Sequence, residues 1–166
     1  MCKEGHAFRG EYLHHCSQVE AWAVAVFSNN LVVESGLLKK RMPHLFGQKL
    51  KAIADLAGAP SPVFSRPKRV SELLEKFQPY AALRADLAHA TMVSAGSNGQ
   101  SIFAFDNPNG PRLPLGRERM WLTPSEALGL LSELKQLTKE ICDQKVRAKA
   151  NPSSPRPPGP AAAGGP

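Results

Sequence analysis

The sequence has few cysteines and no long hydrophobic run, and both absences limit what the protein can be. Its 166 residues include only three cysteines, Cys2, Cys16 and Cys142, which lie far apart and form no CxxC pair. We therefore predict neither a disulfide framework nor a zinc site. The longest apolar stretch, 21–27, is far shorter than the ~18 residues that indicate a membrane span, so no membrane association is expected. The N-terminus lacks the pattern of a secretion signal, which predicts a cytoplasmic protein.

Positive charge is present, and much of it lies near the C-terminus. The formal net charge is +7, and the residues from Gln144 onward carry four cations and no acids, so 7 − 4 leaves +3 for residues 1–143. The remaining cations gather at 39–41, 66–69 and 112–119. Such clusters suit an RNA backbone, because RNA binding is largely electrostatic, and they suit solvated loops equally well.

The composition predicts one globular domain with a tail. Apolar residues make up 42% and charged residues 21% of the chain, as in an ordinary soluble domain. Residues 149–166 are rich in Pro, Ala and Gly and cannot bury enough apolar surface to order themselves, so we expect a disordered tail. The predicted domain covers residues 11–148, and residues 1–10 are expected to be an N-terminal extension.

Apolar spacing predicts the first two helices. A helical stripe runs over 11–27 and is interrupted by Glu20, which either lies at the edge of the stripe or orients a functional group. A short apolar turn is possible at 31–33. The next helix is expected to begin near Pro43 and to stop at Gly58.

In the second half of the chain the apolar pattern changes from helical to strand-like and back to helical. A third helical segment begins near Val70, and Pro79 predicts either a kink or the first turn of a separate helix. The segment 94–100 has the composition of a turn, and 101–106 and 119–122 are predicted to pair as a small β-hairpin. The last helix follows a capping box that begins at Thr123, which makes it the most clearly predicted element.

The third helical segment ends in the heptapeptide Arg84-Ala85-Asp86-Leu87-Ala88-His89-Ala90. An arginine grips phosphate through its planar fork of donors, and a histidine moves protons near neutral pH. On a helix Arg84 and His89 lie about 140° apart. Asp86 lies about 60° from His89, where it is placed to fix the imidazole tautomer or to form an ordinary surface pair.

No metal or cofactor site is predicted. His14, His15 and His44 are the residues that would suggest a metal, but adjacent histidines on a helix point apart and no carboxylate lies at ligand spacing. The chemistry that we predict at Arg84 and His89 requires no cofactor.

With this motif the chain resembles the HEPN superfamily of small helical proteins, many of which are RNases of toxin–antitoxin and other defence systems. The resemblance covers roughly residues 11–145 and rests on three features. These are the Arg-x4-His motif of 84–89, the Ser-Gln-Val-Glu phrase of 17–20, and the order of turn, strand, turn, strand and helix that follows the motif.

The resemblance implies a mainly α fold, a four- to five-helix bundle with a small hairpin before the last helix. It also implies a homodimer whose two motifs face each other and cut RNA without metal, with Arg84 and His89 as the catalytic residues. Asp86 and Glu20 would support them. In such an enzyme the 2′-hydroxyl of RNA is the nucleophile, so DNA would not be cut. A toxin of this kind would be restrained by an antitoxin or another regulatory protein.

One position departs from the family pattern. The family commonly has a polar residue directly after the arginine, whereas this chain has Ala85. The departure keeps open a second interpretation, a catalytically inactive HEPN-like module that binds RNA or protein. A third is a structural helical protein in which the spacing of Arg84 and His89 is a coincidence.

Overall fold

The fold was analysed in a computed structural model, which describes residues 3–34, 42–61, 63–97, 100–106 and 119–147. The expected disordered tail at 149–166 lies outside these residues. The described elements are α1 (Lys3–Phe27), α2 (Asn30–Glu34), α3 (Phe46–Ala57), α4 (Pro67–His89), β1 (Thr91–Ser97), β2 (Gln100–Asp106), β3 (Arg119–Leu122) and α5 (Pro124–Cys142).

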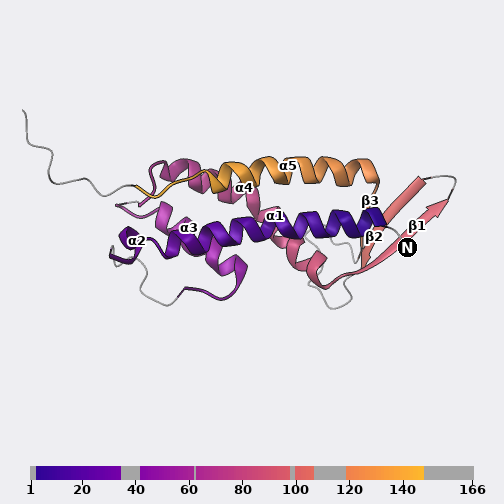
Figure 1. The fold of residues 1–166 in the computed structure, drawn as a ribbon, viewed down its shortest axis with the longest axis horizontal. Coiled ribbons are helices and arrows are strands. Elements are labelled where there is room, and N and C mark those ends of the chain that lie inside the picture. The colour runs from indigo at the N-terminus through magenta and orange to yellow at the C-terminus, as the bar shows by residue number, and fades with distance from the viewer. Residues whose placement is uncertain (1–2, 35–41, 62, 98–99, 107–118, 148–166) are drawn as a thin grey trace, which may run out of the picture.

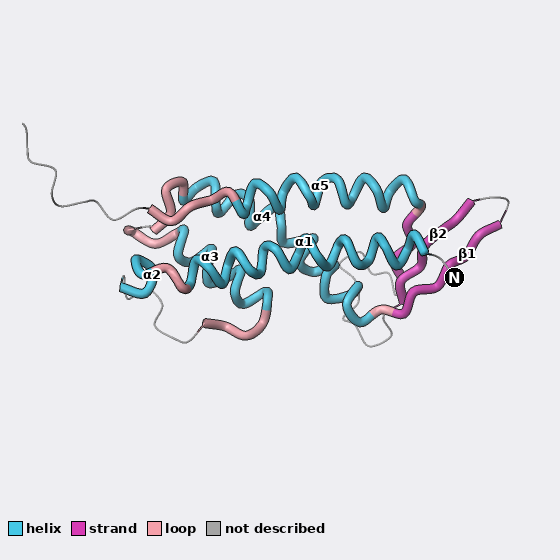
Figure 2. Tube along the Cα trace, in the orientation of Figure 1, coloured by secondary structure: helices cyan, strands magenta, loops and turns pink. Residues whose placement is uncertain are grey.

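The molecule is an elongated helical bundle with a small sheet at one end, as Figures 1 and 2 show. Helices α1 and α5 run side by side, both starting at the sheet end, and α4 runs in the opposite direction and ends there (Figure 1). Helices α2 and α3 lie at the other end (Figure 2). The predicted mainly α class with a small β element is therefore confirmed.

Helix α1 begins at Lys3 rather than at Glu11, so the expected N-terminal extension is helical from Lys3 onward. The early start has a packing cause. Phe8 is 3% exposed, and its ring centroid lies 5.8 Å from those of both Tyr12 and Phe105. Phe8 and Tyr12 are four residues apart, so they share one face of the helix and extend its apolar stripe by a turn.

Helix α4 continues through Pro79 as a single helix, so the expectation of a separate helix at this proline is wrong. Pro79 lies on the exposed side of α4, whereas Phe77 and Leu87 are fully buried on either side of it. A proline removes one helical hydrogen bond and exposes one carbonyl. Water can hydrate that carbonyl here, and burial of the apolar face holds both halves in one helix.

The sheet has three antiparallel strands in the order β1-β2-β3. The predicted pairing of 101–106 with 119–122 is confirmed, since Phe103 is opposite Leu122 and Asp106 is opposite Arg119. The predicted turn at 94–100 is wrong, because 91–97 forms β1 and pairs along its whole length with β2. The two residues between these strands are Asn98 and Gly99, the dipeptide typical of a two-residue hairpin connection.

The helix ends follow local sequence signals. Gly58 follows the last residue of α3, as predicted, although the helix begins at Phe46 and not near Pro43. The capping box of α5 is present: the Thr123 side chain accepts a hydrogen bond from the Glu126 amide at 3.2 Å, and Glu126 in turn accepts one from the Thr123 amide at 2.8 Å. The capping box therefore fixes the start of α5 directly after β3.

Candidate functional site

Arg84 is held by groups from two neighbouring helices. Its Nη2 donates to Glu20 Oε2 of α1 at 3.3 Å, and its guanidinium carbon lies 4.7 Å from the centre of the Phe46 ring of α3. A cation over an aromatic face is attracted by the ring quadrupole. The side chain is 30% exposed. It therefore remains accessible to solvent, while Glu20 and Phe46 fix its orientation.

Lys49 completes the arrangement. Its Nζ lies 2.6 Å from Glu20 Oε1, and its side chain is only 11% exposed. The three charged groups, which we call the ion triad (Lys49, Glu20 and Arg84), join α3, α1 and α4 and carry a net charge of +1. Sequence reasoning missed Lys49, although its place within the apolar stripe of α3, one residue before buried Leu50, was a signal that it is buried.

A thiol lies within the field of the triad. Cys16 is fully buried, and burial raises its pKa to about 12, an effect that the nearby Arg84 cation partly opposes. Because the thiolate is the reactive form of cysteine, Cys16 is inert at neutral pH. It is part of the core and not a nucleophile.

His89 is the last residue of α4, and its ring is exposed. Within the part of the chain that the structure describes, no hydrogen bond or ion pair reaches the imidazole. Asp86, which was expected to orient it, is 9% exposed and belongs to the buried side of α4. The structure therefore brings Glu20 and Arg84 together but does not join Asp86 to His89.

The end of α4 is fixed by Arg9 of α1. Its guanidinium donates to the carbonyl of Ala90 at 3.1 Å and to that of Ala88 at 3.0 Å. These carbonyls flank His89, and the last carbonyls of a helix attract cations. Arg9 thus sets where the chain turns from α4 into β1. No sequence signal indicated this role, because the contact joins residues 81 positions apart.

Arg84 and His89 face different sides of α4. Their positions differ by about 140° around the helix, and Arg84 contacts Glu20 of α1 and Phe46 of α3. In one chain they are therefore a fixed cation and an imidazole without a partner among the described residues. The two lie on either side of one helix end, separated along its axis by about 7–8 Å.

No protein-family model, curated protein or solved structure matches this chain. The geometry of the site itself must therefore carry the functional argument.

Two surface hollows lie away from these residues. One, of about 280 Å³, is apolar and is formed by the first turns of α1, by β2 and by the start of α5; the other, of about 360 Å³, lies between α4 and α5. Neither is lined by any residue of the predicted site.

The described residues hold neither a metal-ligand cluster nor a membrane span. Among the described residues, no three histidine, cysteine or acidic side chains are grouped so as to hold a metal ion. His15, one of the two adjacent histidines of α1, is buried with its Nδ1 3.1 Å from Gln18 Oε1. No helix in the described ranges is long and apolar enough to cross a membrane.

Proposed function

We propose that this chain is a HEPN-like, metal-independent endoribonuclease. The observation that carries the proposal is the end of α4, where a guanidinium held in a fixed orientation by Glu20 and Phe46 lies about 7–8 Å along the helix from an exposed imidazole with no described partner. Because the two groups face different sides of α4 in one chain, the proposal requires a second copy to bring a guanidinium and an imidazole to one phosphate, where they would supply charge stabilisation and proton transfer. Lys49 strengthens the proposal, because it leaves the ion triad with a net positive charge despite Glu20.

The reaction would proceed through the 2′-hydroxyl of RNA. His89 accepts the proton of that hydroxyl, and its oxygen attacks the adjacent phosphorus. The bond to the 5′-oxygen then breaks, an imidazolium donates a proton to this leaving group, and the products are a 2′,3′-cyclic phosphate and a 5′-hydroxyl. Arg84 stabilises the charge on the phosphorane-like transition state.

A second copy of the chain fits the geometry. The exposed side of α4 carries Pro79, Ala82, Ala85 and His89, which lie on one face at intervals of three or four residues. Small side chains allow two helices to approach closely, so Ala85, in place of the polar family residue, suits a close α4–α4 contact. Two-fold pairing would place two imidazoles near each other, one as base and one as acid.

The cellular setting follows from the same proposal. Cys16 and Cys142 are both free thiols, which suits the reducing cytoplasm. An RNase that acts there needs restraint, so an antitoxin or regulatory protein is the expected partner.

His89→Gln tests the proposal directly. The purified protein is incubated with a fluorescent RNA in EDTA, and we expect cleavage to 2′,3′-cyclic phosphate ends that falls at least 100-fold in the variant, the upper part of the effect typical of one acid–base group. The imidazole has no partner among the described residues, so the variant should fold normally. His14→Gln, an exposed histidine on α1, is the matched control and should cleave like the wild type. Equal cleavage by all three proteins would overturn the proposal.

Arg84→Lys separates chemistry from folding. A lysine keeps the charge opposite Glu20 but loses the planar fork, so we expect cleavage to fall while the unfolding midpoint in urea stays near that of the wild type. A variant that cleaves normally would remove Arg84 from the mechanism.

One observation favours the inactive binding module as the second candidate. Glu20 accepts from both Lys49 and Arg84, so the arginine of the motif already has a structural partner inside the bundle. In that case the wild type does not cleave RNA in EDTA, so Arg84→Lys has no cleavage to reduce. Absence of cleavage by a dimeric, folded wild type would favour this candidate.

A further inference from the structure

The end of the bundle opposite the sheet is closed by a pairing between two distant segments. After α5, residues 144–147, which we call the return segment, lie beside residues 63–65, which precede α4. The Ser65 amide donates to the Lys145 carbonyl at 3.1 Å, and the Arg147 amide donates to the Val63 carbonyl at 2.8 Å. Phe64 and Val146 form an isolated antiparallel bridge between them.

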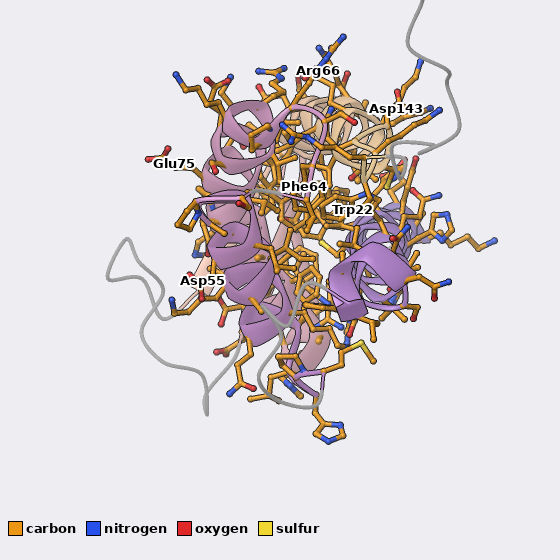
Figure 3. The ribbon with its side chains drawn as sticks, turned by 90° about the vertical axis from the view of Figure 1, so that its left-hand side faces the viewer. Trp22, Asp55, Phe64, Arg66, Glu75 and Asp143 are labelled. Carbon is orange, nitrogen blue, oxygen red and sulfur yellow. The ribbon has the colours of Figure 1, made fainter. Side chains whose placement is uncertain are left out.

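Aromatic packing holds this pairing in place. Phe64 is fully buried and stacks on Trp22 of α1, with ring centroids 6.2 Å apart. Trp22 Nε1 in turn donates to the Gln144 carbonyl at 3.1 Å. In Figure 3 both rings lie in the interior, while Arg66 and Asp143 lie toward the rim. The return segment is therefore a fixed part of the fold.

The pairing brings four cations together, which we call the basic patch (Arg66, Lys68, Lys145 and Arg147). Side chains alternate in an extended segment, so Lys145 and Arg147 point away from the partly buried Val146. Arg66 and Lys68 follow the other paired segment. All four side chains are exposed, and among the described residues none forms an ion pair. Arg147 donates from its Nε to the Phe64 carbonyl at 3.0 Å, and its terminal guanidinium nitrogens have no partner among the described residues.

The acids of this region leave the patch positive. Glu72 and Glu140 are both paired with Arg69, which lies beside the patch on α4. Arg69 and its two acids sum to −1, and Asp143, which is exposed and lies near the patch, adds another −1, so the four cations of the patch leave the region at 4 − 2 = +2. In the sequence the next residues add Lys149 and Arg156 and no acid.

We infer that the basic patch is a binding surface for the phosphate backbone of RNA. Four unpaired cations supplied by two adjacent chain segments match a row of phosphates, whose contacts are mainly electrostatic. A membrane surface fits less well, because binding there also draws on buried apolar side chains. None of the exposed large hydrophobic residues of the described chain belongs to the two paired segments or to the first turn of α4; they are Val33, Met42, Leu45, Trp121 and Leu128.

The patch is separate from the proposed catalytic site. It lies at the start of α4, and His89 lies at the end of this 23-residue helix, about 33 Å away along the helix axis. Binding at the patch does not depend on cleavage at His89, so each property is tested without the other.

The test removes three cations and compares equal charge changes. Binding of a fluorescein-labelled 20-nucleotide RNA to the full chain is measured by anisotropy between 50 and 200 mM salt. We expect Arg66→Gln/Lys68→Gln/Lys145→Gln to reduce the slope of log affinity against log salt by about 2, since each phosphate contact on a single strand contributes about 0.7. At 0.1 M salt this corresponds to an affinity loss on the order of 100-fold.

The matched control is Lys51→Gln/Lys76→Gln/Lys135→Gln, which removes the same charge from exposed positions on α3, α4 and α5. Its RNA affinity should fall by less than about 5-fold, because salt screens cations that do not contact the RNA. An equal loss in both triple variants, or no RNA binding by the wild type, overturns the inference. Stronger binding of the wild type to phosphatidylserine vesicles than to RNA overturns it in favour of a membrane surface. His89→Gln should bind RNA like the wild type, whether or not it cleaves.

Discussion

The two ends of α4 use positive charge in opposite ways. At the start of the helix, Arg66 and Lys68 are exposed and, within the described residues, unpaired. At the far end Arg9 donates to two backbone carbonyls and Arg84 donates to Glu20, so both guanidinium groups hold structure in place. Free cations attract a polyanion from solution, whereas engaged cations fix geometry. On our two proposals, the free cations at the first end bind RNA and His89 at the second end acts on it.

The largest effect on stability is expected from removing the Phe64 side chain, which packs before the start of α4. Phe64→Ala removes a fully buried ring and should lower the free energy of unfolding by about 3–5 kcal/mol. Because Phe64 anchors the return segment, RNA affinity should fall as well. Urea unfolding and RNA anisotropy would measure the two effects.

Two further variants make the Phe64 result interpretable. Phe64→Leu keeps most of the apolar volume and should remain folded, with a smaller loss of stability and of RNA affinity. Leu45→Ala, at a residue that is 64% exposed, should change stability by no more than about 0.5 kcal/mol. If Phe64→Leu unfolds less readily than the wild type, the packing account of this end is wrong.

An intermediate effect is expected at the other end from Arg9→Met. The change keeps the aliphatic stem but removes two charge-assisted hydrogen bonds to the Ala88 and Ala90 carbonyls. Such bonds contribute about 1.5–3 kcal/mol, and we expect a loss of that size in urea unfolding. Cleavage should fall because His89 is no longer held, whereas RNA affinity should stay within 2-fold of the wild type. Lys3→Met, an exposed change on α1, controls for the loss of charge, and an equal effect there would contradict the anchoring role.

The smallest effect is expected at the capping box of α5. Thr123→Ala removes the side-chain cap and should cost about 1 kcal/mol at neutral pH. Ser125→Ala changes an exposed residue two positions further along and should lower the free energy of unfolding by less. A Thr123→Ala protein as stable as the wild type would show that β3 alone determines where α5 begins.

The same box predicts a pH dependence. Hydrogen bonds from the Thr123 amide and then from its hydroxyl lower the pKa of Glu126. A lowered carboxyl pKa contributes stability at neutral pH, above the ordinary pKa, and that stability is lost as the pH falls through the lowered value. The wild type should therefore be more stable than Glu126→Gln at pH 7, and the difference should shrink in acid. A difference that grows in acid would contradict the assignment.

Local signals made much of the fold predictable. The end of α3 at Gly58, the capping box at Thr123 and the pairing of β2 with β3 all depend on residues close together in the chain or on turn and strand composition. Errors arose where distant contacts decide. Phe8 is helical because Phe105 covers it, and residues 94–97 form a strand because β2 pairs with them, despite their small and polar side chains.

The candidate site divides in the same way. From the sequence alone came Arg84 and His89, their separation around the helix, the interruption by Glu20 and the basic character of 66–69 and of the C-terminal residues. These properties depend on residue type and helical period, which are local. Only the tertiary structure joined Glu20 to Arg84 and Lys49, placed Arg9 on the end of α4, and set Lys145 beside Ser65. Each of these contacts links residues 29 or more positions apart, and burial of apolar side chains between the helices decides which of them form.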